Sequence, residues 1–330
     1  MTPPLVSILI NNYNYAQFLR EAIESALSQS YSHVEIIVVD DGSTDQSREI
    51  ILSYGSRLIP IFKENAGQAS AFNAGVAASR GDILCFLDSD DYYYPDKIAR
   101  VVEVFRGLDI AKPLMVHHRL KVSREDGKPN RHEFDGMIHD NPLNLAEYAR
   151  KYKFMDYAGV STTGISINRR MSDLLFPLPG HVRISADEFI VRGASLVGEL
   201  HSSIDVLGVY RIHGTNHWYT GLRTKSVEFS EALDRYLNQK LKENKLPGRI
   251  SYSESMLCWC DLLRDERWAE LARRMVIVNA LQHDRHTLLW TYGICKSAAR
   301  PFLKKVLPSM LTRIYKKHIK GIRWKSSAME

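Results

Sequence analysis

The chain has 330 residues, of which 45% are hydrophobic and 25% are charged. This length is enough for one large or two modest globular domains with a substantial core. The four cysteines are too few and too poorly spaced for a disulfide framework or a zinc knuckle, and a reducing cytoplasm fits them best. No apolar run reaches the roughly 18 residues that span a bilayer. Met1 leads almost directly into a predicted strand, so no signal peptide is expected.

The net charge of +6 is concentrated at the C-terminus. Residues 301–330 contain eight Lys or Arg and one acid, Glu330, whereas the other 300 residues contain 36 basic and 37 acidic side chains. The basic balance therefore belongs to the tail. It gives no reason to expect nucleic acid as a partner of the rest of the chain.

Strand patterns alternate with helical patterns through the first 110 residues. Strands are predicted at 5–10, 34–39, 58–62 and 83–87, and helices at 18–27, from Ser43 or Thr44 to about 53, at 68–79 and after Pro95. This alternation predicts an α/β fold with a doubly wound, mostly parallel sheet flanked by helices.

The regular alternation of strand and helix patterns ends at about residue 110. Further strands are predicted at 114–122, 159–167 and 204–209, and further helices at 143–153 and 187–197. From about residue 224 the pattern is helical to the end, without the β/α alternation. We therefore expect a first domain at residues 1–220 and a helical C-terminal region at residues 221–330.

The most informative stretch is the fourth predicted strand, because it ends in three carboxylates, Asp88, Asp90 and Asp91. Carboxylates this close repel one another unless a positive charge lies among them, and a hard divalent cation is the usual partner. An isolated Asp-x-Asp is more often a solvated turn that caps the next helix. Here its position at the carboxyl end of a buried strand favours a ligand site.

Three other strand ends and turns carry candidate residues. Tyr13 is suited to lie against a nucleobase, and Asp40 to accept a hydrogen bond from a base or ribose, although both are also ordinary turn residues. Asp187 and Glu188 open a predicted helix, where the helix dipole alone favours carboxylates. His213 and His217 are four residues apart, but the Gly-Thr-Asn between them disfavours a helical zinc site.

Two nucleotide-binding motifs are absent from the sequence. No Gly-x-Gly-x-x-Gly follows the first strand, and no Gly-x-x-x-x-Gly-Lys-Ser/Thr occurs, which argues against a Rossmann dehydrogenase and a P-loop NTPase.

Taken together, several motifs in order resemble those of the family 2 glycosyltransferases, which have the GT-A nucleotide-sugar transferase fold. The motifs lie at residues 6–14, 29–31, 35–45, 65–67, 72–75 and 86–91. The resemblance is dense over residues 5–100 and looser to about 217. Two departures are visible: Asn11-Asn12 replaces the usual Pro-Thr, and Ala186-Asp187-Glu188 replaces the usual Glu-Asp pair.

The resemblance implies roles for individual residues. Those implied at the nucleotide are Tyr13, Asn14, Asp40, Asn65, Asn73 and Asp88, and those implied at the metal are Asp90 and His213. Asp187 corresponds best to the catalytic base, with Glu188 second. The implied reaction is an inverting transfer of a sugar from a nucleoside-diphosphate sugar to an acceptor hydroxyl, with Mn²⁺ or Mg²⁺ as cofactor. A UDP-hexose is the expected donor, and a cell-surface glycan or lipid-linked sugar the expected acceptor.

The basic tail alternates apolar and basic residues at helical spacing between about 303 and 325. One interpretation is an amphipathic helix that lies on an anionic membrane, and the other is a helix packed on the body with a solvated basic face. The expected location is therefore the cytoplasm, with peripheral membrane contact as an open alternative.

Two other functions stay open at this point. A sugar nucleotidyltransferase has a related sheet and acidic metal site, but a glycine-rich phosphate loop with a basic residue would be expected where residues 11–14 stand. A catalytically inactive sugar-nucleotide-binding protein is the other alternative, which the change at Ala186 keeps open.

Overall fold

The computed structural model describes residues 2–125, 133–136, 138, 141–146, 160–214, 216 and 227–251. All of them lie in the first of two compact units, Met1–Ser255 and Met256–Glu330. The expected tail helix at 303–325 and most of the expected helix at 143–153 lie outside the described residues. No helix in the described part is long and apolar enough to cross a membrane.

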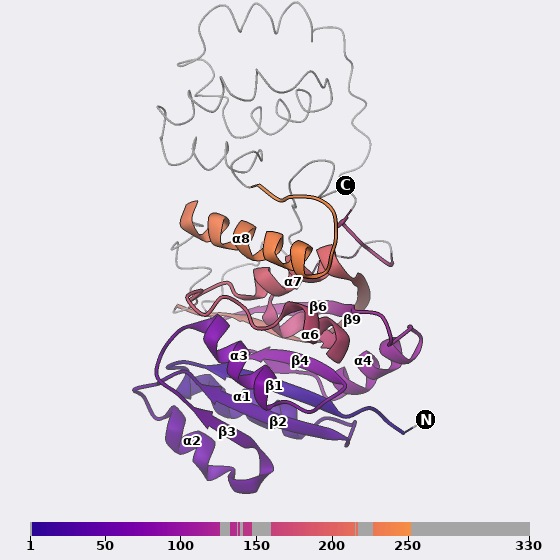
Figure 1. Cartoon of the computed structure of the whole chain (residues 1–330). Coiled ribbons are helices and arrows are strands. Elements are labelled where there is room, and N and C mark those ends of the chain that lie inside the picture. Colours follow the sequence, from indigo (N-terminus) through magenta and orange to yellow (C-terminus); the bar gives the residue numbers. More distant parts are fainter. Residues whose placement is uncertain are drawn as a thin grey trace, which may run out of the picture. The chain divides into compact units, whose positions relative to one another are not determined.

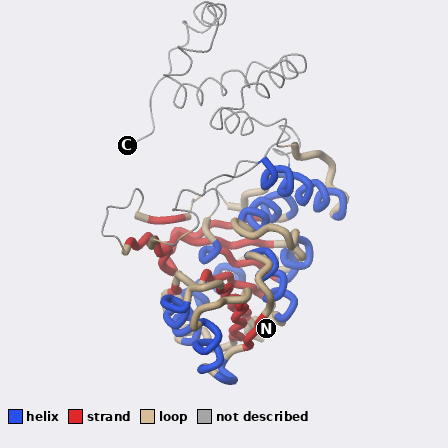
Figure 2. The backbone as a smooth tube through the Cα atoms, turned by 90° about the vertical axis from the view of Figure 1, so that its left-hand side faces the viewer, coloured by secondary structure: helices blue, strands red, loops and turns tan. Residues whose placement is uncertain are grey.

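The described residues form one mixed sheet between two layers of helices (Figures 1 and 2). Four parallel strands make its first half, in the order β3-β2-β1-β4. Their bounds are Val6–Asn12 (β1), Val34–Asp40 (β2), Ile59–Phe62 (β3) and Ile83–Asp88 (β4). The helices that connect and follow them are Ala16–Leu27 (α1), Ser47–Ser53 (α2), Gln68–Ala78 (α3) and Lys97–Arg106 (α4). The predicted parallel, doubly wound half of the sheet is confirmed.

The second half of the sheet continues from β4 in the order β8-β6-β9-β5, with β7 also paired to β6. Its strands are Tyr92–Tyr93 (β5), Leu114–Arg124 (β6), Phe134–Asp135 (β7), Ile165–Asn168 (β8) and Glu199–Ile212 (β9). The helices of this half are Arg169–Leu175 (α6), Asp187–Val197 (α7) and Val227–Glu243 (α8). Only β6 and β9 are parallel here; the other pairs are antiparallel. The sequence analysis missed β5, β7 and α6, and β9 is longer than the strand expected at 204–209.

The strand expected at 159–167 is shorter than predicted. Thr162–Gly164 form a 3₁₀ turn, and strand β8 begins only at Ile165. Gly164 is needed in this turn because a Cβ atom there would lie 2.3 Å from Val160 Cγ2 and 3.0 Å from the His118 carbonyl oxygen. The turn therefore lies directly against β6.

Alternating side chains of the strands fill two separate cores, one on each face of the sheet. On β1, Leu9 belongs to the core formed with α3, α6, α7 and α8, whereas Ile8 and Ile10 belong to the core formed with α1, α2 and α4. Helix α8 packs on α7 and adds Leu233 and Leu237 to the first core. The domain boundary expected at residue 220 stays a prediction.

Strand β6 changes the face to which its side chains point. Its pairing with β9 shifts register between His118 and Arg119 and again between Arg119 and Lys121. Consequently Met115 and Leu120 pack in the same core although they are five residues apart, an odd separation that regular alternation would place on opposite faces.

Lys97 and His118 are fully buried basic side chains that lie close to each other. Lys97 Nζ donates to Ser166 Oγ (3.2 Å) and lies 4.2 Å from the centre of the Tyr93 ring, and burial lowers its pKa. His118 Nδ1 bonds the Arg119 carbonyl oxygen at 2.9 Å. Burial first, and then the nearby positive charge of Lys97, lower the pKa of His118 to about 3.

This low pKa makes stability depend on pH. An unfolded histidine binds a proton below about pH 6.5, but folded His118 does so only near pH 3, so stability falls as the pH falls through this window. Between pH 6.5 and about pH 4.5 His118 should account for about 2 kcal/mol of lost unfolding free energy. His118→Asn, whose amide nitrogen can replace Nδ1, should flatten this part of the curve. Urea unfolding of both proteins at several pH values measures the difference; parallel curves would contradict the prediction.

Candidate functional site

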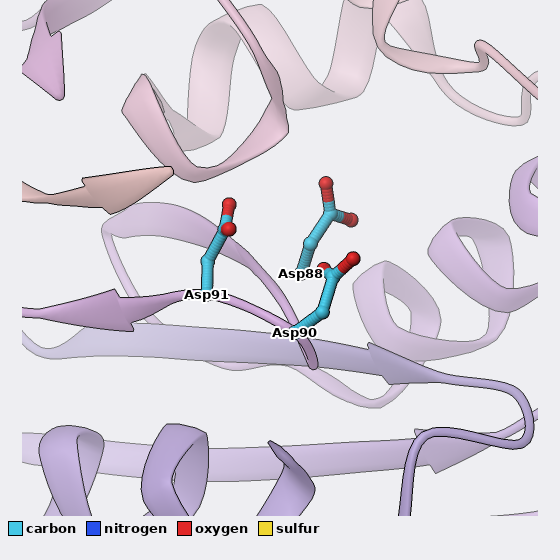
Figure 3. A group of neighbouring side chains, drawn as sticks. All are labelled: Asp88, Asp90 and Asp91. Atoms are coloured by element: carbon cyan, nitrogen blue, oxygen red, sulfur yellow. The ribbon is translucent and has the colours of Figure 1, made fainter. Parts of the chain in front are cut away.

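The carboxyl ends of the parallel strands β1, β2 and β4 meet at one edge of the sheet. Asn12, Asp40 and Asp88 are the last residues of these strands, and the pairing places Asn12 beside Asp40 and Asn11 beside Asp88. The tight turn after β4, in which the Asp91 N–H donates to the Asp88 carbonyl oxygen (3.0 Å), carries Asp90 and Asp91 to the same place. Figure 3 shows the three carboxylates rising from this turn toward the same side.

One carboxylate oxygen from each of Asp88, Asp90 and Asp91 lies within 4.8 Å of the others. Burial and the negative charge of Asp90 raise the pKa of Asp88 to about 7. Burial raises the pKa of Asp91 well above its usual value, and the charges of Asp90 and Asp88 add to this effect. The cluster therefore concentrates more negative charge than the folded protein alone accommodates at neutral pH.

Distant segments hold two of these carboxylates in place. Asn11 Nδ2 donates to Asp88 Oδ1 at 2.9 Å. Asp91 accepts hydrogen bonds from the Thr163 hydroxyl (2.5 Å) and from the Arg211 N–H (2.8 Å). Strand β9 and the turn before β8 thus fix Asp91, whose oxygens are engaged by protein donors.

The structure brings Asp90 and His213 together, as the resemblance implies. His213 Nε2 lies 3.0 Å from Asp90 Oδ2, and its ring packs against Phe18 with centroids 4.5 Å apart. Asn216, which sequence reasoning did not select, donates through Nδ2 to Asp90 Oδ2 (3.2 Å) and accepts the His213 N–H. Asn216 could have been found only as a polar residue in the same short turn as His213.

This donor set fits a divalent cation. Carboxylate oxygens are hard ligands, an imidazole is a common ligand of the first-row transition ions, and a dication would offset the charge that raises the two aspartate pKa values. Asp90 and His213 would hold the ion, and Asp88 and Asp91 would lie beside it.

Asp40 lies at the end of β2 and is only 4% exposed. It accepts hydrogen bonds from Asn12 Nδ2 (2.9 Å), from the Ser43 hydroxyl (2.5 Å) and from the Ser43 N–H (3.2 Å). Ser43 therefore binds Asp40 and does not cap α2. The helix expected to begin at Ser43 or Thr44 begins later, at Ser47, where the Asp45 carboxylate accepts the Ser47 N–H at 3.0 Å.

Tyr13 and Asn14 form the turn next to Asp40. The Tyr13 side chain is 42% exposed, so its ring is available to a ligand. Asn14 has a φ of +57°, a conformation that asparagine tolerates better than most residues, and its Oδ1 accepts the Thr44 N–H at 2.7 Å. Asn14 thus ties the turn after β1 to the turn after β2.

The turn at residues 65–67 is held by Asp41, the residue that follows β2. The Asp41 carboxylate accepts the Ala66 and Gly67 N–H groups (3.1 and 2.7 Å) and pairs with Lys63 Nζ (2.5 Å). Gly67 has a φ of +94°, and a Cβ atom there would lie 2.4 Å from Arg183 Cα. Only glycine permits this close approach.

The two asparagines expected at the nucleotide have partners in the protein. Asn65 Oδ1 accepts a hydrogen bond from the Arg183 guanidinium. Asn73 binds both backbone groups of Leu178, through Nδ2 at 2.8 Å and Oδ1 at 2.7 Å. Their nucleotide contacts stay predictions, and any contact through the Asn73 amide would compete with these two bonds.

The segment before α7 lies across the beginning of α3. The Gln68 and Ala69 N–H groups donate to the carbonyl oxygens of Arg183 and Val182, at 3.0 and 3.1 Å. The Gln68 side chain accepts the Ala186 N–H at 2.8 Å and lies 3.5 Å from the Thr162 hydroxyl. Thr162 is next to Thr163, which donates to Asp91. Gln68 thus connects the start of α7 with the turn that holds the acidic cluster, a role that sequence reasoning missed.

Asp187 and Glu188 are in the first turn of α7. Glu188 pairs with Arg192 one helical turn later, with Arg192 Nε 2.8 Å from Glu188 Oε2. Asp187 Oδ1 accepts the Glu188 N–H at 3.0 Å. The Glu188 carboxylate is thus engaged by a guanidinium on its own helix.

Comparison with known proteins identifies the family. The model of the family described as "Glycosyl transferase family 2" matches residues 7–172. An uncharacterized glycosyltransferase of Nostoc sp. (strain PCC 7120) is 33% identical over 264 residues, which cover 76% of this chain and 80% of that protein. The chain belongs to glycosyl transferase family 2. A Rickettsia prowazekii glycosyltransferase is 48% identical over 106 residues, 32% of this chain and 33% of that relative.

A solved structure confirms the fold of this glycosyltransferase. The crystal structure of S. aureus TarS 1-349 in complex with UDP-GlcNAc covers 82% of this chain and 72% of its own, with 18% identity and a TM-score of 0.53. The predicted GT-A fold is therefore confirmed, and so is membership of a glycosyltransferase family. The roles of individual residues stay predictions.

Removing one charge from the acidic cluster should stabilise the metal-free glycosyltransferase. The pKa of Asp88 rises from 3.8 to about 7 on folding, so its ionisation destabilises the fold increasingly as the pH rises through that window. With EDTA at about pH 8, Asp88→Asn should melt about 5 °C above wild type, which corresponds to about 2 kcal/mol. The difference should disappear near pH 4. Asp173→Asn, on the exposed side of α6, is the control and should not shift the Tm.

Proposed function

We propose that this glycosyltransferase moves a hexose from a nucleoside-diphosphate sugar to an acceptor hydroxyl in the assembly of a cell-surface glycan. The proposal depends on one observation. The Gln68 side chain contacts both the start of α7, through the Ala186 N–H, and the turn Thr162–Gly164, whose Thr163 donates to Asp91 of the acidic cluster. A donor held at the cluster would therefore have a candidate base at a fixed position.

The donor side of the site supports a nucleotide. The exposed ring of Tyr13 would stack on the nucleobase. Asp40, whose carboxylate accepts three hydrogen bonds from Asn12 and Ser43, would bind the polar edge of that base. Asp88 would bind the ribose. The structure of S. aureus TarS with UDP-GlcNAc, which has the same fold, makes UDP-hexoses the first donors to test.

The reaction needs the negative charge of the departing diphosphate to be neutralised. A bound Mn²⁺ or Mg²⁺ supplies Lewis-acid stabilisation of that charge. The residues that would hold the ion are Asp90 and His213, and Asn216 holds the Asp90 carboxylate beside the His213 ring.

The base should be Asp187. A single displacement needs a carboxylate that removes the acceptor proton while the hydroxyl attacks the anomeric carbon, and it inverts that centre. Glu188 is less suited to this role because its carboxylate is paired with the Arg192 guanidinium, which favours its ionised, hydrogen-bonded state.

Replacement of the base should leave the affinity for the donor unchanged and slow the transfer of the sugar. Asp187→Asn should lower kcat by about 10² to 10⁴, the usual contribution of general-base catalysis, with little change in the Kd for the nucleotide sugar. Glu188→Gln is the matched control on the same helix turn and should lose less than tenfold. If the two effects are reversed, Glu188 is the base.

Donor and metal should stabilise the protein together. A thermal-shift screen of UDP-glucose, UDP-galactose, UDP-GlcNAc and GDP-mannose, each with and without Mn²⁺, should give one donor whose Tm shift requires the ion. A ligand at 100 times its Kd adds about 3 kcal/mol. Asp90→Ala should abolish the joint shift. Equal shifts with and without Mn²⁺ for every donor would contradict a metal-dependent site.

The basic tail is proposed to give peripheral contact with the inner face of the membrane. The support comes from the sequence alone, since residues 303–325 lie outside the described part of the chain. Deleting residues 303–330 should reduce sedimentation with vesicles that contain phosphatidylserine by tenfold or more, and high salt should do the same to the full chain. Unchanged sedimentation would exclude this role for the tail.

A further inference from the structure

Two polar residues flank strand β6 beyond the acidic cluster, one on each side. On one edge, Asp135 of β7 is opposite Leu120; on the other, Tyr210 of β9 is opposite Val122. Residues directly opposite each other in a sheet share a face, and so do Leu120 and Val122, which are two positions apart. Asp135 and Tyr210 therefore lie on the same face of the sheet. Their Cα atoms are two strand spacings apart, or about 10 Å, and offset by about 7 Å along the strands.

This shared face is the one that carries the candidate base. Leu120 belongs to the core that includes Phe189 of α7, and Tyr210 packs against that core. The register shifts at His118–Lys121 are what turn this part of β6 to that face. Without them, Leu120 and the residues opposite it would point toward α1 and α4. Bulges next to ligand sites commonly re-aim side chains in this way.

Tyr210 offers a hydrogen-bond donor next to the acidic cluster. Its neighbour Arg211 donates its backbone N–H to Asp91, so the two residues reach the cluster together. Burial, and then the negative charges of Asp91, Asp90 and Asp135, raise the pKa of Tyr210, which keeps its hydroxyl protonated. Within the described part of the chain this hydroxyl forms no hydrogen bond.

Asp135 offers an acceptor whose position is fixed. Its Oδ2 atom accepts the Ser161 N–H at 3.0 Å and the Ser161 hydroxyl at 2.8 Å. Both bonds use the same oxygen, and among the described residues Oδ1 has no hydrogen-bond partner. Ser161 precedes the turn that carries Thr163, which in turn binds Asp91. One short segment, residues 161–163, therefore forms hydrogen bonds with both Asp135 and the acidic cluster.

We propose that Tyr210 and Asp135 form a sugar-binding subsite, in which a sugar ring lies between them with one hydroxyl accepting from Tyr210 and another donating to Asp135. A sugar fits because its adjacent hydroxyls both donate and accept, and because an aromatic ring can pack on its C–H face. This inference rests on the proposed function. The sugar has two possible sources, the hexose of the donor and the terminal sugar of the acceptor.

Calorimetric titration of the full chain with Mn²⁺ distinguishes the two sources. The ligands are UDP, the UDP-hexoses UDP-glucose, UDP-galactose and UDP-GlcNAc, and, on the UDP-bound protein, the corresponding methyl glycosides. Tyr210→Phe and Asp135→Asn should each leave the Kd for UDP within twofold of wild type. Each should raise the Kd for the preferred UDP-hexose at least tenfold if the subsite takes the donor sugar, or the Kd for a methyl glycoside at least tenfold if it takes the acceptor.

Tyr236→Phe is the matched control. Tyr236 is a buried tyrosine on α8 whose hydroxyl donates to the Leu175 carbonyl oxygen at 2.9 Å. Its replacement should lower the Tm without changing any Kd, which separates loss of packing from loss of a ligand contact. Tyr210→Phe should do the opposite, with an unchanged Tm and a changed Kd.

Three outcomes would contradict the proposed subsite. The wild type binds no UDP-hexose more tightly than UDP and binds no methyl glycoside; or the variants bind every sugar ligand with the wild-type Kd; or the variants lose as much affinity for UDP as for the UDP-hexose. Failure of the proposed function looks different. In that case the wild type binds neither UDP nor any UDP-hexose, whatever the state of Tyr210 and Asp135.

Discussion

The mutual repulsion of three neighbouring carboxylates is the constraint on which this structure depends. Asp88, Asp90 and Asp91 each place an oxygen within 4.8 Å of the others at the end of a strand whose preceding residues are buried on both faces. Removing such charges from water is costly, and bringing them together adds to that cost. A fold that keeps them there has to hold them by bonds from elsewhere. It does so with Asn11, Thr163, the Arg211 backbone, His213 and Asn216.

The second half of the sheet supplies most of those bonds. Both donors to Asp91 come from it, Thr163 from the turn before β8 and the Arg211 N–H from β9. Here β8 is antiparallel to β4, so the turn before it brings Thr163 to the carboxylates. Arg211, near the C-terminal end of the long strand β9, and His213, just after it, lie beside the same carboxylates. The mixed topology therefore places donors from distant segments around the carboxylates of the candidate site.

The sequence predicted the first half of the fold well and the second half less well, for a physical reason. In β1 to β4, apolar runs and turn residues coincide with the elements, so local pattern and tertiary structure agree. In the second half, the 3₁₀ turn before β8 and the register shifts of β6 arise from contacts between segments far apart in the chain. Periodicity carries no signal for such contacts. The same holds for the site: Asp88 and Asp90 are visible as a cluster in sequence, whereas Gln68 is important only because Ala186 and Thr162 lie next to it.

The first N–H groups of α3 are bonded to another segment of the chain, and this affects how a negatively charged ligand can bind. In many nucleotide-binding proteins, the free N–H groups at the start of a helix cradle phosphate. Here the backbone of residues 182 and 183 caps the first N–H groups of α3, and Gly67 lets that backbone come close enough to do so. The Gln68 and Ala69 N–H groups are thereby already bonded within the chain. A negatively charged ligand at this edge of the sheet would therefore have to be bound by groups other than these two N–H groups.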